Sequence, residues 1–181
     1  DGAFLCENSW GTEFGTDGFF YVSYYDANLG KTAIQYKKTE DTDRYDRIYQ
    51  SDLCGWIGQA GYGAETVWAV NVYTAESEEA LEAAGFYATG ENSGYEVYVV
   101  RELPQETDVL ETSCFQQREL CASGHLEYAG YYTIPLKQPV MLKPGERFGI
   151  MIKITTPGAV HPAAIEYDAG DGKCRIDLTD G

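Results

Sequence analysis

Short apolar runs separated by turn residues dominate the pattern along the chain, and they predict β-strands. The clearest runs are residues 65–73, 95–100, 131–136 and 147–155, and shorter ones follow at 163–167 and 174–178. In the run 65–73 both alternating sets of positions contain apolar side chains, which is typical of a strand inside a β-sandwich. Trp68 lies in the middle of this run, and we predict that it packs in the core.

The turn residues between these runs indicate antiparallel connections. In Lys143-Pro144-Gly145-Glu146, proline fixes φ near the value that the second position of a type II turn needs, and glycine tolerates the positive φ of the third. Asn92-Ser93-Gly94 is a second turn signal. The predicted fold class is therefore all-β, with an antiparallel, jelly-roll-like β-sandwich.

One segment has a different preference. Residues 76–84 (ESEEALEAA) have high helix propensity. Because the segment is short and Gly85 ends it, we predict one turn of helix at most, followed by a strand through Phe86 and Tyr87.

The first fifty residues differ in character from the rest. Apolar runs at 3–7 and 19–25 flank a stretch with Gly11, Gly15 and Gly18, which predicts two strands joined by a long loop. The charged stretch 39–47 lacks periodicity and is interpreted as a linker or crossover loop, and the pattern before it allows one short strand at 33–36.

Composition agrees with a β-protein and narrows the partners. The 181 residues are 44% hydrophobic and include 15 Tyr and 20 Gly, which favours strands over helices. Thirteen basic and 29 acidic residues give a formal net charge of −16, which disfavours nucleic acid and anionic lipid as partners. No apolar run reaches the roughly 18 residues that a membrane span needs.

The five cysteines leave the redox state open. Their number is odd, so at least one thiol stays unpaired if disulfides form. Cys114 and Cys121 enclose a short polar stretch and could form a local disulfide, and several free, mostly buried thiols are the alternative. The absence of a CxxC spacing argues against zinc, and the sequence predicts no cofactor and no metal site.

Aromatic and acidic residues in loops supply the candidates for ligand binding. Trp56 and Tyr62 lie in the glycine-rich stretch 54–63, where a Trp can serve as a platform for the apolar face of a sugar. Asp46 and Asp52 are the candidate polar partners. The alternatives are that Trp56 packs under its loop and that the aspartates belong to a solvated loop. The acidic residues at 168–177 are interpreted as a turn, and His125 and His161 receive no role.

Residues 6–21 (CENSWGTEFGTDGFFY) resemble the asparagine segment of papain-type cysteine peptidases. The resemblance implies that Asn8 orients the catalytic His and that Trp10 shields that hydrogen bond from water. Phe14 departs from the family pattern, which has a second Trp there. His125 and His161 follow Asn8, whereas the family's Cys and His precede it, so this chain alone is not expected to be active. The alternative is a simple β-hairpin in which Asn8 is solvated or bonded to backbone.

The region 48–178, with AVNVYTA, YYTIPL and LKPGE, resembles the lectin-like domain that follows such peptidases in bacterial surface proteins. We therefore expect three parts: a peptidase strand pair at 1–28, a linker at 29–47 and a lectin-like sandwich at 48–181. The resemblance implies a secreted or cell-surface accessory region whose partners are the upstream peptidase domain and a glycan or cell-wall polymer. The alternatives are a structural or protein-docking module, and the Asn-bearing part of a peptidase that an upstream chain completes.

Overall fold

The computed structural model describes residues 2–31, 33–36, 43–51, 54–105, 107 and 109–167. The chain divides into two compact units, Asp1–Arg47 and Ile48–Gly181, which we call the hairpin unit and the sandwich unit. Asp52, Cys174 and the strand expected at 174–178 lie outside the described residues.

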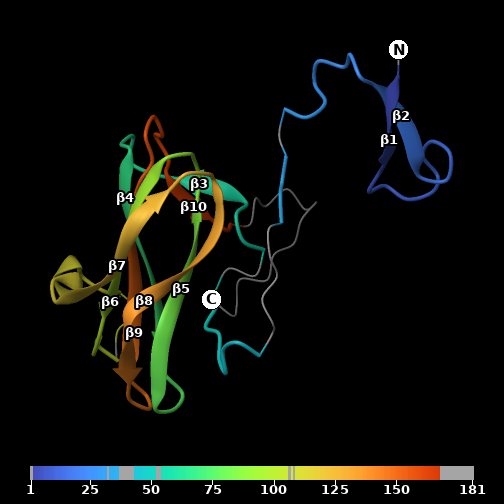
Figure 1. Ribbon diagram of the computed structural model, residues 1–181. Helices are drawn as coiled ribbons and strands as arrows, with labels where there is room; N and C mark the ends of the chain where they lie inside the picture. Colours follow the sequence, from blue (N-terminus) through green and yellow to red (C-terminus); the bar gives the residue numbers. More distant parts are fainter. Residues whose placement is uncertain are drawn as a thin grey trace. The chain divides into compact units, whose positions relative to one another are not determined.

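The hairpin unit consists of two antiparallel strands, β1 (Ala3–Glu7) and β2 (Phe19–Ser23). They are joined by a long loop, which is blue in Figure 1. All three glycines of this loop have positive φ. The strand that the pattern allowed at 33–36 does not form.

Two antiparallel sheets build the sandwich unit. The larger sheet has the order β4-β9-β6-β7, and β5 pairs with β8 in the second sheet. A short pair, β3 with β10, lies at one end (Figure 1). The bounds are β3 Gly58–Ala60, β4 Thr66–Thr74, β5 Glu79–Ala88, β6 Ser93–Val100, β7 Arg118–Leu126, β8 Gly130–Leu142, β9 Arg147–Thr155 and β10 Ala163–Ile165, with a 3-10 helix η1 at Thr112–Phe115.

The described residues contain no α-helix, and no helix among them is long and apolar enough to cross a membrane. The predicted all-β fold with an antiparallel sandwich is confirmed.

The core fills the space between the two sheets. Its centre is Phe148, which is fully buried and packs edge-on against Tyr49 with ring centroids 5.6 Å apart. The larger sheet contributes Val97 and Val99 to the same cluster, and the smaller sheet contributes Leu142. Because alternate residues of a strand point to opposite faces, this inner set fixes which side chains of each strand point outward.

One prediction about this unit is partly right and one is wrong. Strand β5 includes Phe86 and Tyr87 as predicted, but it begins earlier, at Glu79, because pairing with β8 places Ala84 and Ala88 in the core and overrides helix propensity. Trp68 is 42% exposed, so it does not lie in the core.

Cys114 and Cys121 do not form the local disulfide that the sequence allowed. Both are free thiols, and burial raises the pKa of Cys121.

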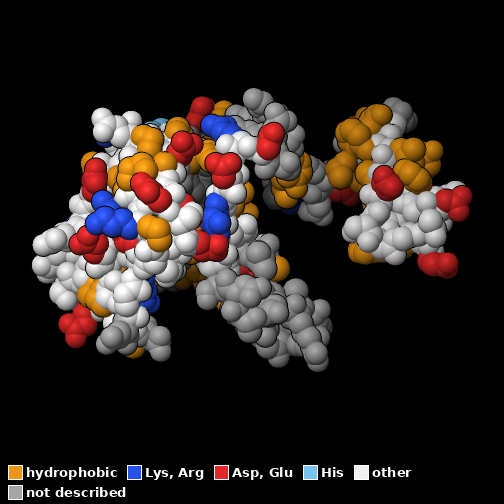
Figure 2. All heavy atoms as spheres, turned by 90° about the horizontal axis from the view of Figure 1, so that it is seen from below, with side chains coloured by type: hydrophobic (Ala, Val, Ile, Leu, Met, Phe, Trp, Pro, Cys, Tyr) orange, Lys and Arg blue, Asp and Glu red, His pale blue; other side chains and the backbone are white. Residues whose placement is uncertain are grey.

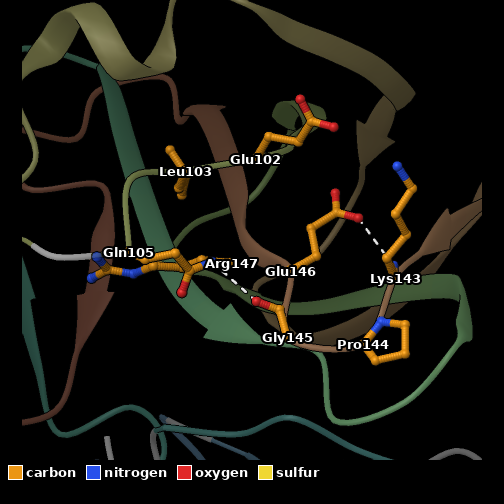
Figure 3. A pocket seen from close by; sticks show the side chains of 8 residues that line it. All are labelled: Glu102, Leu103, Gln105, Lys143, Pro144, Gly145, Glu146 and Arg147. Carbon is orange, nitrogen blue, oxygen red and sulfur yellow. Dashed lines mark hydrogen bonds between the residues drawn. The ribbon is translucent and has the colours of Figure 1, made fainter.

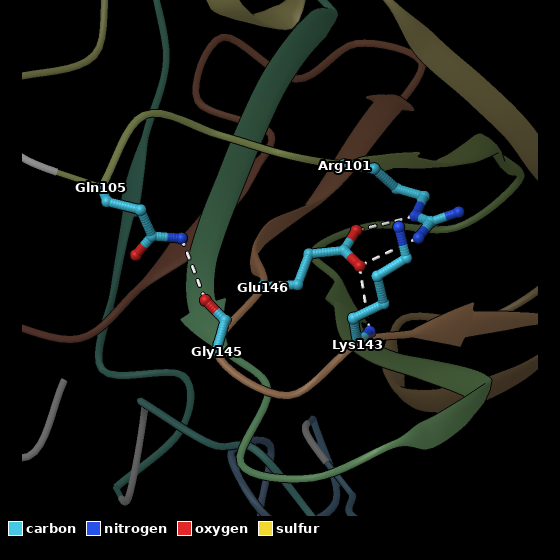
Figure 4. Close-up of polar contacts among 5 residues, drawn as sticks. All are labelled: Arg101, Gln105, Lys143, Gly145 and Glu146. Atoms are coloured by element: carbon cyan, nitrogen blue, oxygen red, sulfur yellow. Dashed lines mark hydrogen bonds and ion pairs between the residues drawn. The ribbon is translucent and has the colours of Figure 1, made fainter.

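The predicted turn at Lys143-Pro144-Gly145-Glu146 forms between β8 and β9. Gly145 has φ +75°, and the Glu146 N–H donates to the Lys143 carbonyl at 3.0 Å. The buried Glu146 carboxylate accepts two hydrogen bonds from Arg101, at 2.8 and 2.9 Å, and one from the Lys143 N–H (Figure 4). These bonds attach the segment that follows β6 to the turn.

A hollow of about 350 Å³ lies beside this turn. Figure 3 shows Gln105 reaching the turn, where its Nε2 donates to the Gly145 carbonyl at 3.0 Å. Arg147 donates to the carbonyls of Pro104 and Thr107. Since these polar groups form hydrogen bonds with one another, we interpret the hollow as part of a structural connection between the turn and the segment after β6.

Glu146→Gln is expected to lower the free energy of unfolding by about 1–2 kcal/mol, because the charged hydrogen bonds are lost while Arg101 stays partly solvated. Arg101 holds the pKa of Glu146 below its ordinary value of 4.5. The contribution of the carboxylate is therefore fully present above pH 4.5 and is lost as the pH falls through the folded-state pKa. Urea unfolding of both proteins should give curves that converge in acid. Glu102→Gln, an exposed neighbour, is the control, and an equal loss in that variant would contradict the account.

Candidate functional site

The outward face of the four-stranded sheet, which we call the outer face, carries an ordered row of polar and aromatic side chains. Trp68 on β4 lies opposite Lys153 on β9, and Lys153 lies opposite Glu96 on β6. Glu96 in turn lies opposite Ser123 on β7. Directly opposite residues have neighbouring Cβ atoms, so antiparallel pairing alone brings these four side chains together.

Trp68 is the centre of a cluster of aromatic and charged groups. Its ring packs on Tyr98 with centroids 5.5 Å apart. The Arg118 guanidinium carbon lies 4.9 Å from the Trp68 centroid, and the Lys153 ammonium lies 5.5 Å from it. Both cations are within the range of favourable cation–π attraction, so they hold the exposed indole in a defined orientation.

Glu96 links the cluster by hydrogen bonds. Its carboxylate accepts from the Lys153 ammonium at 2.7 Å and from the Tyr98 hydroxyl. The bond from Lys153, and then that from Tyr98, lowers the pKa of Glu96. The same contacts raise the pKa of Lys153 and of Tyr98. At neutral pH the cluster therefore holds a carboxylate, an ammonium and a guanidinium beside two aromatic rings.

A hollow of about 330 Å³ adjoins this cluster. Glu96, Lys153, Ser123 and Thr155 line it, and Gly94, opposite Thr155, keeps it open because it carries no side chain. The other half of the outer face is covered, because Val100 and Met151 pack there against Leu103 and Phe115 of the segment after β6. Among the described residues of this face, those around Trp68 and the hollow are therefore the ones accessible to a ligand.

Trp56 and Tyr62, two of the residues predicted as ligand-binding, are not members of the Trp68 cluster. Trp56 is half-buried and packs against Tyr87, with centroids 6.1 Å apart, and Tyr87 packs on Tyr131. Tyr62 is 90% exposed. Asp46 is exposed and belongs to the hairpin unit. Trp56 and Tyr62 are thus in the sandwich unit but outside the Trp68 cluster.

Asn8 and Trp10 lie in the loop of the hairpin unit. Asn8 Nδ2 donates to the Gly18 carbonyl at 2.7 Å, and Asn8 Oδ1 accepts from the Trp10 N–H at 2.6 Å. The Trp10 side chain is 75% exposed and contacts the Phe14 ring edge-on. The backbone bonds fix the carboxamide, and its oxygen retains a second lone pair for another donor.

The sequence contained a signal for the Trp68 cluster that our prediction missed. Lys153 interrupts an apolar strand between two isoleucines, and Glu96 stands between Tyr95 and Val97. A charged residue at the centre of a buried strand indicates an accessible face. The pairing of β9 with both β4 and β6 could not be derived from these patterns, because the strands are far apart in sequence.

Within the part of the chain that the structure describes, no group of three or more His, Cys, Asp or Glu side chains is arranged to hold a metal ion. The described groups of the outer face can stack, form hydrogen bonds and form ion pairs.

Comparison with known proteins decides the family. The family model of the lectin-like domain matches residues 48–181. The chain belongs to the lectin-like domain family. No curated protein matches the chain.

Two solved structures resemble both parts of the chain. One is a clostridial cysteine protease, Cwp84, after propeptide cleavage, with a TM-score of 0.63, 25% identity and coverage of 94% of this chain and 41% of that chain. The other holds the cysteine protease and lectin-like domains of Cwp84, a surface layer associated protein of Clostridium difficile, with a TM-score of 0.60, 27% identity and coverage of 93% and 36%. The chain thus spans less than half of each. The predicted combination, a papain-like peptidase ending followed by a lectin-like domain, is confirmed.

Proposed function

We propose that this chain is an accessory region of a cell-surface cysteine peptidase and that its lectin-like domain binds carbohydrate on the outer face. The observation that carries the proposal is the exposed Trp68, which is oriented by Arg118 and Lys153 and adjoins a polar hollow.

The chemistry of the hollow suits a saccharide. An indole offers an apolar surface to the C–H face of a pyranose ring, while the polar groups in the hollow hydrogen-bond with its hydroxyls. Glu96 accepts from hydroxyls, Lys153 donates to them, and Ser123 does both. Because β-strands hold these groups, little side-chain freedom is lost on binding.

A surface location is also part of the proposal. Both solved relatives are described as cysteine proteases, and one is described as a surface layer associated protein. A carbohydrate-binding domain in such a protein would hold the peptidase near its substrates. The acidic charge of −16 agrees with a partner other than nucleic acid.

A second aromatic surface favours another function, the docking of a protein domain. Tyr87 on β5 and Tyr131 on β8 have ring centroids 4.9 Å apart, and Trp56, in the loop before β3, packs against Tyr87 and extends this row. Rows of aromatic side chains with few charges are typical of protein interfaces. The peptidase domain is the expected partner of this row.

The carbohydrate proposal is tested by screening the full chain against a broad glycan panel and comparing Trp68→Ala with Tyr62→Ala. The wild type should bind at least one glycan class. Trp68→Ala should weaken binding about tenfold or more, since loss of an aromatic platform costs about 1–3 kcal/mol. Trp68→Phe should retain part of the affinity, and circular dichroism should show that all variants are folded.

The panel results separate the two surfaces. Loss of binding in Tyr62→Ala with full binding in Trp68→Ala would move the site to the loop 54–63. Absence of binding to every glycan would contradict the carbohydrate function and leave docking as the account of the domain.

A further inference from the structure

Arg118 is held in place by contacts that do not neutralise it. Its guanidinium lies over both Trp68 and Tyr98, and Nη1 donates to the Phe115 carbonyl at 3.0 Å. Among the described residues, no carboxylate lies within ion-pair distance of it. The side chain is exposed, so its remaining N–H donors face solvent.

The nearest acid in the cluster is already engaged. Glu96 accepts hydrogen bonds from Lys153 and Tyr98, and Arg118 acts on it only through space. Two cations and one carboxylate give the cluster a formal charge of +1 in a chain of net charge −16. Figure 2 shows acidic and basic side chains next to one another on the visible face of the sandwich unit.

A guanidinium that is held in position but has no carboxylate partner can bind an anion. Arginine presents a planar fork of donors that matches a carboxylate or a phosphate, and stacking on aromatic rings leaves the edge of the fork accessible. Trp68, Tyr98 and the Phe115 carbonyl already restrict the Arg118 side chain. The binding of an anion there therefore costs little additional conformational entropy.

We propose that the outer face prefers saccharides that carry an anionic group, a carboxylate or a phosphate, and that Arg118 is the residue that recognises this group. The sugar ring occupies the hollow beside Trp68, and the anion lies against the guanidinium edge. The inference rests on the proposed carbohydrate binding and specifies its ligand class.

The test uses the full chain and two matched pairs of ligands in calorimetric titrations at low salt. A galacturonic acid trisaccharide is compared with its methyl ester, which keeps the sugar and removes the charge. A phosphorylated disaccharide is compared with its unmodified form, and inorganic phosphate is titrated alone. At least one acidic ligand should bind about tenfold or more tightly than its neutral partner, since a charged hydrogen bond contributes about that factor.

Substitutions then identify the residue responsible. Arg118→Gln should bind charged and neutral ligands with equal affinity. Because Arg118 also orients Trp68, that affinity should lie at or below the wild-type affinity for the neutral ligand. Arg118→Lys should keep a reduced preference, because it retains the charge without the planar fork. Lys137→Gln, which removes one positive charge from the other sheet, should leave the preference within about twofold and serves as the charge control.

The outcomes distinguish this inference from the function on which it rests. Equal affinity of the wild type for charged and neutral ligands, or a preference that survives Arg118→Gln, would overturn the role of Arg118 while leaving carbohydrate binding intact. Inorganic phosphate binding as tightly as the acidic saccharides would mean that the site recognises an anion and no sugar, which would also overturn it. Absence of binding to every saccharide tested would instead contradict the proposed function.

Discussion

Phe148→Ala is expected to lower the free energy of unfolding of the sandwich unit by about 3–5 kcal/mol, the usual cost of emptying a buried aromatic site. Phe148 is fully buried at the centre of the core, between strands of both sheets. Its ring also contacts Tyr49 and Tyr73, with centroids 5.6 and 5.9 Å away, so the truncation removes two aromatic contacts as well as apolar area. Urea unfolding followed by circular dichroism measures the loss.

Two control variants give this prediction its specificity. Phe148→Leu keeps most of the buried volume and should cost about 1 kcal/mol. Tyr62 lies on the surface, so Tyr62→Ala should change the free energy of unfolding by less than about 0.5 kcal/mol. A loss below about 1 kcal/mol in Phe148→Ala would show that the space between the sheets is not the packed core described above.

In a protein in which a catalytic Cys and His precede this chain in sequence, Asn8→Ala is expected to lower kcat/KM roughly a hundredfold. The reason is that an imidazole without its orienting Asn adopts unproductive tautomers and positions. The Asn8 carboxamide is fixed by the Gly18 carbonyl and the Trp10 N–H, which leaves its oxygen able to accept from an imidazole. Peptide hydrolysis at several substrate concentrations gives kcat and KM separately.

The control for Asn8 is Trp10→Phe, which keeps an apolar side chain over the proposed hydrogen bond and should cost about tenfold or less. A purely structural role of Asn8 would appear as lower thermal stability of the hairpin unit with unchanged kcat/KM in the folded fraction. That result would mean that the hairpin has a structural role and that Asn8 does not orient the catalytic His.

The strands with strong local patterns were predictable. Residues 147–155 alternate so regularly that prediction and structure agree at both ends. The turn before this strand was also predictable, because Pro144 and Gly145 each satisfy one backbone requirement of a type II turn. In both cases the signal lies within a few neighbouring residues.

Strands that depend on distant partners were missed, as β7 was, or predicted only in part, as β5 was. Strand β7 (Arg118–Leu126) contains Glu119, Ala122 and Gly124, residue types with low strand preference, and it forms because it pairs along β6. Strand β5 has helix-forming residues and becomes a strand through its partner β8. Pairing partners of this kind cannot be derived from local propensity.

The candidate site shows the same limit. Trp68 was assigned to the core because both faces of its strand are apolar. Val70 and Val72, on the same face as Trp68, are covered by the segment after β6, whereas Trp68 lies beyond that cover. The family resemblance was available from NSWG and from AVNVYTA, but the register that joins Trp68, Lys153 and Glu96 required the structure.

The most direct test of carbohydrate binding on the outer face uses the indole N–H signals of the three tryptophans in a two-dimensional NMR titration with a glycan that the chain binds. Trp10 reports on the hairpin unit, Trp56 on the row with Tyr87, and Trp68 on the outer face. The account predicts that the Trp68 signal shifts with saturation, together with the amides of Glu96 and Ser123, while the Trp10 and Trp56 signals stay in place. A titration that shifts the Trp56 signal and leaves Trp68 unchanged would contradict it.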